Sequence, residues 1–297
     1  MRRIALFSAL LGASLCTPTL ASASTIRHDV ADSNYTALAA TFPSVGSILV
    51  SGSNFGSATL IGPNWILTAA HMGAPGSSGT LTIGGNNYSF TNLLVHPNYD
   101  STTLAFDFAV AQLTSTVSNV TPSAYYNGGG KLGRTGTSVG FGGFGTGLTG
   151  ATQAGGTKRA FTNVIEMSDG TYLDCDFDNP AGTANMMNQF APSSPTPTAL
   201  EGNVAPGDSG GGLFMDFGFG QWLSGVTSYV WWDGGDSTFP DGAPYGRYGQ
   251  GSGWADISLG AAWIQQTTGI APVPEPASIA AVGLGVLALL RRRRTSK

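Results

Sequence analysis

Residues 207–211 read Gly207-Asp208-Ser209-Gly210-Gly211, which places a serine inside a tight glycine turn. Glycines allow the backbone around Ser209 to aim its N–H groups at one point, where they can stabilise the negative charge that develops on a carbonyl oxygen. A serine hydroxyl is a weak nucleophile, so it needs a base within hydrogen-bond reach and a third group that orients this base. The turn therefore predicts catalysis only if such partners exist elsewhere in the chain.

Two upstream segments supply these partners. Residues 67–71 are a β-like run that ends in His71, and residues 107–110 place Asp107 at the start of an apolar strand. The glycine turn also fits the looser Gly-x-Ser-x-Gly pattern of α/β-hydrolases, in which the histidine follows the serine. That type of site is excluded, because all three histidines of the chain precede Ser209; they are His28, His71 and His96.

Each partner has an alternative. Asp100 competes with Asp107 as the acid, and the position of Asp107 against the apolar strand favours Asp107. His96 begins a His-Pro-Asn-Tyr sequence, which is typical of a turn, so we expect a turn residue there and not a catalyst.

Taken together, these motifs resemble the trypsin/chymotrypsin family of serine proteases over most of residues 42–266. Further similar segments are Val95-His96-Pro97-Asn98-Tyr99, Val139-Gly140-Phe141-Gly142 and Trp263-Ile264-Gln265-Gln266. The resemblance implies an all-β, chymotrypsin-like fold of two six-stranded antiparallel barrels with a short C-terminal helix. It also implies a serine endopeptidase that needs no metal and no cofactor.

The resemblance assigns roles residue by residue. It makes Ser209 the nucleophile, His71 the general base and then acid, and Asp107 the group that orients His71. The N–H groups of Gly207 and Ser209 match the oxyanion hole. The remaining matches concern substrate binding: Asn203 corresponds to the base of the side-chain pocket, and Ser228, Tyr229 and Val230 form an edge strand for the substrate backbone.

The sequence departs from the family pattern at the activation site. The Ile-Val-Gly-Gly sequence with which active members of the family usually begin is missing. In the family, the freed N-terminal amine pairs with a buried carboxylate, and Asp208 matches this carboxylate. One hypothesis is cleavage before Ile26; the other is that Arg27 or His28 supplies the cation. Asn203 has no carboxylate, so we predict a preference for neutral or small side chains over Lys or Arg.

The rest of the body shows short β-prone runs separated by Gly, Asn, Pro and Ser, and only residues 259–268 invite a helix. Six basic and 16 acidic side chains lie between Ser24 and Pro274, which gives this part a formal charge of −10. Such an acidic body lacks the electrostatic footprint of a nucleic-acid-binding protein. We therefore expect no nucleic acid among its partners.

Both ends of the chain are predicted to be targeting segments. Two arginines, an apolar run and small residues ending in Ala21-Ser22-Ala23 predict a signal peptide over residues 1–23. Residues 272–297 contain Pro274-Glu275-Pro276, an apolar run over 279–290 and four arginines, and they resemble the PEP-CTERM sorting signal of Gram-negative bacteria. This resemblance implies an exosortase-type partner, a transient inner-membrane anchor through a short transmembrane segment, and delivery to the cell surface or extracellular matrix. A trypsin-like domain over 24–271 lies between the two segments.

Two features of the body have simpler readings than a functional site. The alternating carboxylates of residues 174–178 suggest a calcium loop, but Asn179 and Asn185 replace its expected Gly and Glu, so we favour a strand that runs into a turn. Cys175 is the one cysteine left after signal removal, and we expect it to be inert. The sequence leaves two competing functions open, namely a catalytically silent protease-like binding protein of the matrix and an esterase that uses the same residues.

Overall fold

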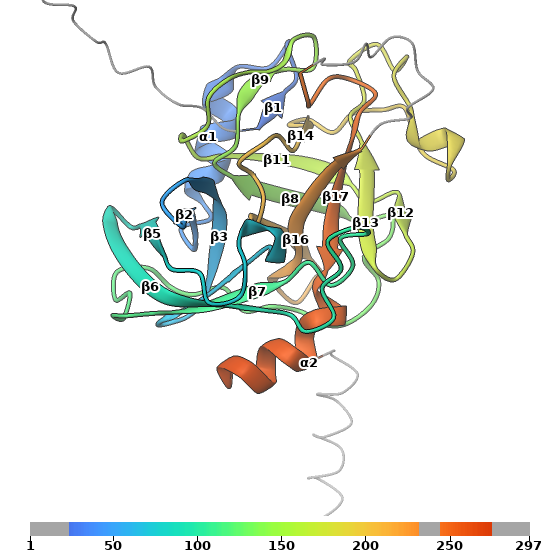
Figure 1. Cartoon of the computed structure of the whole chain (residues 1–297). Helices are drawn as coiled ribbons and strands as arrows, with labels where there is room; N and C mark the ends of the chain where they lie inside the picture. The colour runs from blue at the N-terminus through green and yellow to red at the C-terminus, as the bar shows by residue number, and fades with distance from the viewer. Residues whose placement is uncertain (1–23, 232–243, 275–297) are drawn as a thin grey trace, which may run out of the picture.

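The computed structural model describes residues 24–231 and 244–274. The predicted signal peptide, most of the predicted sorting signal and residues 232–243 lie outside this part. The described residues form two β-lobes, with one helix against the second lobe and another at the C-terminal end (Figure 1).

The first lobe is a closed barrel of six antiparallel strands in the order β2-β3-β4-β7-β6-β5. Alternating runs suit strands that bury one face in the barrel, and continuous apolar runs such as residues 65–67 suit strands that are buried on both faces. Their bounds are β2 Val45–Val50, β3 Asn54–Gly62, β4 Trp65–Thr68, β5 Gly79–Ile83, β6 Asn86–Val95 and β7 Ala109–Leu113.

The second lobe is a curled sheet of seven strands in the order β11-β8-β15-β16-β17-β13-β12. Its strands are β8 Thr135–Gly140, β11 Arg159–Val164, β12 Met167–Ser168, β13 Tyr172–Asp176, β15 Gly212–Asp216, β16 Gln221–Trp231 and β17 Gly251–Asp256. The predicted fold class is confirmed, with the difference that this lobe is a curled half-barrel where two closed barrels were expected. The predicted strand at residues 174–178 is present as β13, which is followed by a turn at Asn179.

A small four-stranded sheet in the order β10-β9-β1-β14 holds the start of the described chain. Its strands are β1 Thr25–Ile26, β9 Phe144–Thr146, β10 Gly150–Gln153 and β14 Gly202–Asn203. In this sheet β1 pairs in parallel with β9 and in antiparallel with β14. The pairing buries Thr25 and Ile26, so the first described residues lie inside the second lobe.

Two helices flank the sheets. The expected C-terminal helix is α2, Ile257–Thr268, which begins where the Asp256 side chain accepts the Ser258 N–H and ends at Gly269 with a left-handed φ of 75°. The sequence did not predict α1, Asp32–Ala40. This helix packs on β11, where Asp32 makes a two-point ion pair with Arg159 at 2.5 and 2.6 Å. Two 3₁₀ turns complete the elements: η1 Ala70–Met72 and η2 Met187–Gln189.

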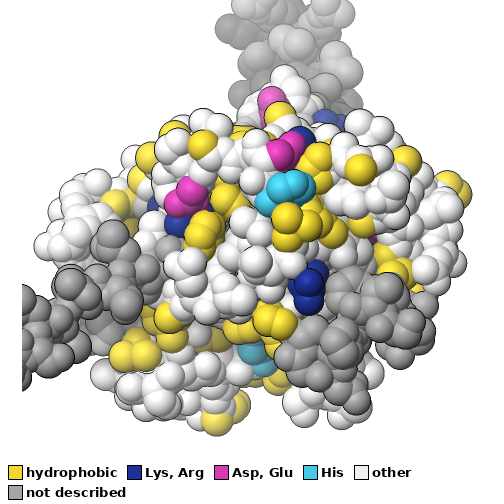
Figure 2. All heavy atoms as spheres, turned by 90° about the horizontal axis from the view of Figure 1, so that it is seen from above, with side chains coloured by type: hydrophobic (Ala, Val, Ile, Leu, Met, Phe, Trp, Pro, Cys, Tyr) yellow, Lys and Arg dark blue, Asp and Glu magenta, His cyan; other side chains and the backbone are white. Residues whose placement is uncertain are grey.

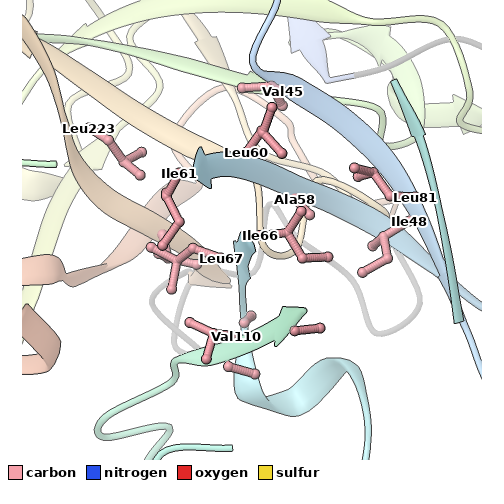
Figure 3. Packing of buried hydrophobic residues seen from close by; sticks show 14 of the residues in the cluster. Val45, Ile48, Ala58, Leu60, Ile61, Ile66, Leu67, Leu81, Val110 and Leu223 are labelled. Atoms are coloured by element: carbon pink, nitrogen blue, oxygen red, sulfur yellow. The ribbon is translucent and has the colours of Figure 1, made fainter. Parts of the chain in front are cut away.

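The main hydrophobic core fills the first barrel and continues into the second lobe. Figure 3 shows Val45, Ile48, Leu60 and Ile66 from the barrel strands together with Leu223 of β16, all fully or almost fully buried. Because this core extends from one lobe into the other, residues at the junction pack against buried side chains of both lobes. Among the described residues no disulfide contributes, since Cys175 is buried and free.

The described residues contain no helix that is both long and apolar enough to cross a membrane. Figure 2 shows that one face of the molecule carries few charged side chains, which are scattered among polar and hydrophobic ones. This surface agrees with the low charged fraction of 10% in the sequence.

Candidate active site

The pairing of β4 with β7 brings His71 to Asp107. In this antiparallel pair Thr68 lies opposite Ala109, so the end of β4 meets the start of β7. His71 follows in η1, and Asp107 lies two residues before β7. The His71 Nδ1 is 2.7 Å from Asp107 Oδ2, and the His71 backbone N–H donates to Oδ1 at 2.9 Å. Two contacts to one carboxylate therefore fix both the ring and the backbone of His71.

Asp107 is an acceptor for three donors and is fully buried, with 0% of its surface exposed. The third donor is the Ser228 hydroxyl, which lies 2.5 Å from Oδ2. An ionised carboxylate here makes the Nδ1 of His71 the protonated nitrogen, and this leaves Nε2 with a lone pair. A neutral histidine in this tautomer can accept a proton.

The two alternative residues lie apart from this contact. Asp100 is exposed, and its Oδ1 accepts the N–H groups of Thr102 and Thr103, which lower its pKa. His96 is buried against Phe106, its Nδ1 accepts the Asn98 N–H, and burial lowers its pKa. Both residues thus belong to the loop before Asp107, and in the described part of the chain neither is hydrogen-bonded to His71.

The turn that carries Ser209 is tied to both lobes. The Ser209 carbonyl accepts the Ser57 N–H from β3 at 2.8 Å, and the Gly210 N–H donates to Thr227 of β16 at 2.8 Å. Gly210 has a φ of +81°, and a Cβ there would overlap the Thr68 hydroxyl and the Ser57 carbonyl oxygen. The position therefore accepts only glycine, for reasons of both backbone conformation and space.

Two N–H groups of this turn have no hydrogen-bond partner among the described residues. The N–H groups of Asp208, Gly210 and Gly211 all donate to backbone carbonyls, whereas within the described residues those of Gly207 and Ser209 donate to none. Gly207 has a φ of +97°, and its carbonyl accepts the Ser57 hydroxyl at 3.0 Å. The unused pair is suited to bind an external oxygen.

Asp208 is buried behind the turn, and no cation of the described residues lies at contact distance from it. Its Oδ1 accepts the Gly142 N–H at 2.8 Å, and its Oδ2 accepts the Ala205 N–H at 2.9 Å and the Ser24 hydroxyl at 3.0 Å. Burial raises the pKa of Asp208 to about 6, against the opposing effect of these donors and of the Arg159 charge. A buried carboxylate of this kind gains most from a nearby positive charge.

Neither predicted cation contacts Asp208. Arg27 pairs with Asp29 at 2.7 Å and donates to the Thr198 carbonyl, while the Nδ1 of His28 lies 2.8 Å from the Tyr248 hydroxyl. The residue that does reach Asp208 is Ser24, which sequence reasoning missed. The predicted cleavage after Ala23 was the available signal, because it makes Ser24 the first residue of the processed chain.

A cavity of about 320 Å³ lies beside Ser209. Ser228, Tyr229 and Val230 of β16 line it together with Ser209 and Tyr245, so the structure brings the predicted substrate segment to the serine. Asn203 is fully buried and is not among the lining residues; its side chain accepts a hydrogen bond from Ser252. Its neighbour Val204 is part of the cavity wall.

This arrangement is a chymotrypsin-like fold, with the His71–Asp107 pair and the turn of Ser209 both held at the junction of the two lobes. The sequence pattern of the trypsin family matches residues 32–244, and that of the PEP-CTERM protein-sorting motif matches residues 272–294. The chain therefore belongs to the trypsin family and ends in a PEP-CTERM sorting motif of the kind found on exosortase-sorted surface proteins of Gram-negative bacteria. A comparison with curated proteins found no match.

Proposed function

We propose that this protein is a secreted or surface-anchored serine endopeptidase that cleaves peptide bonds through an acyl-enzyme on Ser209. The observation that carries the proposal is the contact of the buried Asp107 carboxylate with His71 Nδ1 at 2.7 Å. This contact leaves His71 Nε2 as the base for the serine proton. Without Asp107 the ring would be free to adopt the other tautomer.

The proposed reaction has two stages. His71 takes the Ser209 proton as the oxygen attacks the substrate carbonyl, and the Gly207 and Ser209 N–H groups stabilise the resulting oxyanion. His71 then gives the proton to the leaving amine, which departs as the acyl-enzyme forms. In the second stage a water molecule gives its proton to His71 and attacks the ester, which releases the acid and restores Ser209.

The substrate backbone has an edge strand available. From Gln221 to Val226, β16 pairs with β15, and from Gly225 onward it pairs with β17 on its other side. Beyond Thr227, only the pairing with β17 continues within the described residues. Ser228, Tyr229 and Val230 therefore present an open edge beside Ser209, and an extended peptide can add to it by main-chain hydrogen bonds.

The cavity favours a neutral side chain. Among the described residues that line it there is no carboxylate, while Val204, Val230 and two tyrosines supply an apolar wall. Against these described lining residues a Lys or Arg side chain would be buried without a counter-charge, which is strongly unfavourable. We infer a preference for small or neutral residues, set by Val230 and Val204 and not by Asn203.

Activation is assigned to removal of the signal peptide. Cleavage after Ala23 frees an α-amino group on Ser24, the residue whose side chain already contacts Asp208. The alternative cut before Ile26 would remove Thr25, which pairs with β9 and β14. Cleavage by the export machinery then suffices, and the PEP-CTERM motif delivers the processed enzyme to the cell surface.

Labelling with a fluorophosphonate probe tests this function. The chain, expressed with both targeting segments and isolated after export, should react with the probe, while Ser209→Ala should not. The Ser118→Ala variant is the control: it lacks an exposed serine far from Ser209 in the sequence and should react like the parent protein. An exported, folded parent that stays unlabelled would support the silent binding protein instead. Labelling with turnover of esters but not of peptides would support the esterase.

A further inference from the structure

The hairpin between β15 and β16 ends in a cluster of aromatic side chains that catalysis does not use. Its sequence is Phe217-Gly218-Phe219-Gly220-Gln221-Trp222. Phe219 is 37% exposed, and Phe217 and Trp222 are half-buried. We call these three residues the aromatic tip. Three rings that together stay partly open to solvent at a hairpin end form an apolar patch of the kind that marks an interaction site.

The aromatic tip rests on Tyr126. The Phe217 ring lies 4.2 Å from the Tyr126 ring, and Phe219 lies 5.9 Å from Tyr126 and 6.4 Å from Trp222 between ring centroids. The Arg134 guanidinium stacks over Phe217 at 4.7 Å and donates to the Asp216 carbonyl. The aromatic tip therefore lies beside a cation, Arg134. Leu132, close to Arg134 in the sequence, is 60% exposed.

The sorting motif leaves the body at this place. The Val273 N–H donates to the Tyr125 carbonyl at 2.8 Å, and Val273 forms a parallel bridge with Tyr126. The Tyr125 hydroxyl also holds the Ile270 carbonyl at 2.7 Å. The last described residues before Glu275 are thus fixed to the residue on which the aromatic tip rests.

Little chain separates this point from the apolar run of the tail. Four residues, 275–278, lie between Pro274 and Ile279. Even fully extended, this length of chain spans only about 17 Å. When the run from Ile279 to Leu290 is in a bilayer, the surface around Val273 must lie at the lipid headgroups. Aromatic rings and arginine are the side chains that prefer this interface.

We propose that the aromatic tip lies on the lipid surface while the sorting tail is in the membrane, and so holds the protease body in one orientation. The proposal rests on membrane anchoring by the tail. The rings enter the headgroup region, and Arg134 faces the lipid phosphates. Asp216 is the exposed carboxylate next to the tip, and its Oδ1 is already engaged by the Gly218 N–H at 2.7 Å.

An environment-sensitive dye on the tip tests this contact in the full chain. Phe219→Cys, in a Cys16→Ser background, is labelled with NBD and reconstituted in phosphatidylethanolamine/phosphatidylglycerol vesicles that contain doxyl-labelled lipid. Cys175 is fully buried and does not compete for the label. The matched control is Leu148→Cys, which labels another exposed apolar residue, 55% exposed, between β9 and β10.

We expect quenching by the doxyl lipid at least about twofold greater at position 219 than at position 148. The additional change Trp222→Ser should weaken the quenching at position 219 while leaving that at position 148 unchanged. Equal quenching at both positions would overturn the proposal, as would a chain that fails to float with the vesicles. Fluorophosphonate labelling of the same samples reports separately on catalysis, so failure of the membrane contact and failure of the protease function are distinguishable.

Discussion

The Ser24 hydroxyl lies 3.0 Å from an oxygen of the Asp208 carboxylate, and both residues are almost completely buried. Asp208 directly precedes Ser209, and its Oδ1 also holds the Gly142 N–H. The start of the described chain is therefore connected to the turn that carries the nucleophile. A positive charge on the α-amino group of Ser24 would therefore act on that turn through the Asp208 carboxylate.

This contact predicts that active enzyme begins at Ser24. The freed amine of Ser24 should pair with Asp208, because a buried carboxylate without a cation is unstable. Asp208→Asn should lower kcat/KM by the equivalent of about 3 kcal/mol. Ser24→Ala keeps the amine and should retain most of the activity. N-terminal sequencing of fluorophosphonate-labelled protein checks the start, and an active form that begins at Ile26 would contradict it.

A second prediction separates Asp107 from Asp100. Asp107→Asn should reduce kcat by about 10⁴-fold, since an amide at this place favours the wrong tautomer of His71. Asp100→Asn is the matched control. It changes an exposed turn residue whose carboxylate accepts the N–H groups of Thr102 and Thr103, and it should leave kcat unchanged. Steady-state kinetics on one peptide substrate decides, and a comparable loss in both variants would remove Asp107 from the mechanism.

The motifs around His71, Asp107 and Ser209 were readable in the sequence because catalytic turns and strand ends have strong local signals. The four-stranded sheet could not be predicted from the sequence, because β1 and β14 are only two residues long and are too short to show a hydrophobic periodicity. Helix α1 was missed because it is short and buries only Tyr35 and Ala39. Asn203 was aligned by its spacing from Ser209, but spacing does not show that β14 turns its side chain toward Ser252.

Gly210 and Gly76 have similar positive φ angles, but we expect their replacement by alanine to destabilise the protein to different extents. Gly210→Ala should destabilise the fold and abolish labelling of Ser209, because the added methyl group overlaps Ser57 and Thr68. Gly76 has a φ of +86° but open space around it, so Gly76→Ala should cost only about 1–2 kcal/mol. Denaturant unfolding measures both. Equal losses would mean that only the backbone angle matters at Gly210.

The side-chain preference of the enzyme should depend on Val230. We expect a peptide library to show cleavage after small, neutral residues and little cleavage after Lys or Arg. Val230→Gly removes an apolar side chain from the cavity wall and should extend cleavage to larger neutral residues. Asn203→Ala should not shift the preference in this way, because Asn203 does not line the cavity. A shift caused by Asn203→Ala but not by Val230→Gly would reverse the assignment.

From the acidic residues at and just after the end of β13, we expect the free energy of unfolding to decrease as the pH rises. Burial raises the pKa of Asp178 to about 8, and the charges of Asp176 and Glu201 act in the same direction. The Asp178 Oδ1 is buried without a hydrogen-bond partner in the described part of the chain. In the unfolded chain this carboxyl loses its proton near pH 4, whereas in the folded protein it keeps the proton until about pH 8.

The unfolded state thus binds fewer protons than the folded state between these two pKa values, so the free energy of unfolding decreases with pH across this window. One such group contributes a slope of at most about 1.4 kcal/mol per pH unit. Asp178→Asn should flatten the profile and raise stability near pH 8, while Asp216→Asn, at an exposed position, should not. Urea unfolding at intervals from pH 5 to about 9 measures the effect. A parent profile that rises between pH 5 and 8, or one that Asp178→Asn leaves unchanged, would show that Asp178 is ionised in the folded protein.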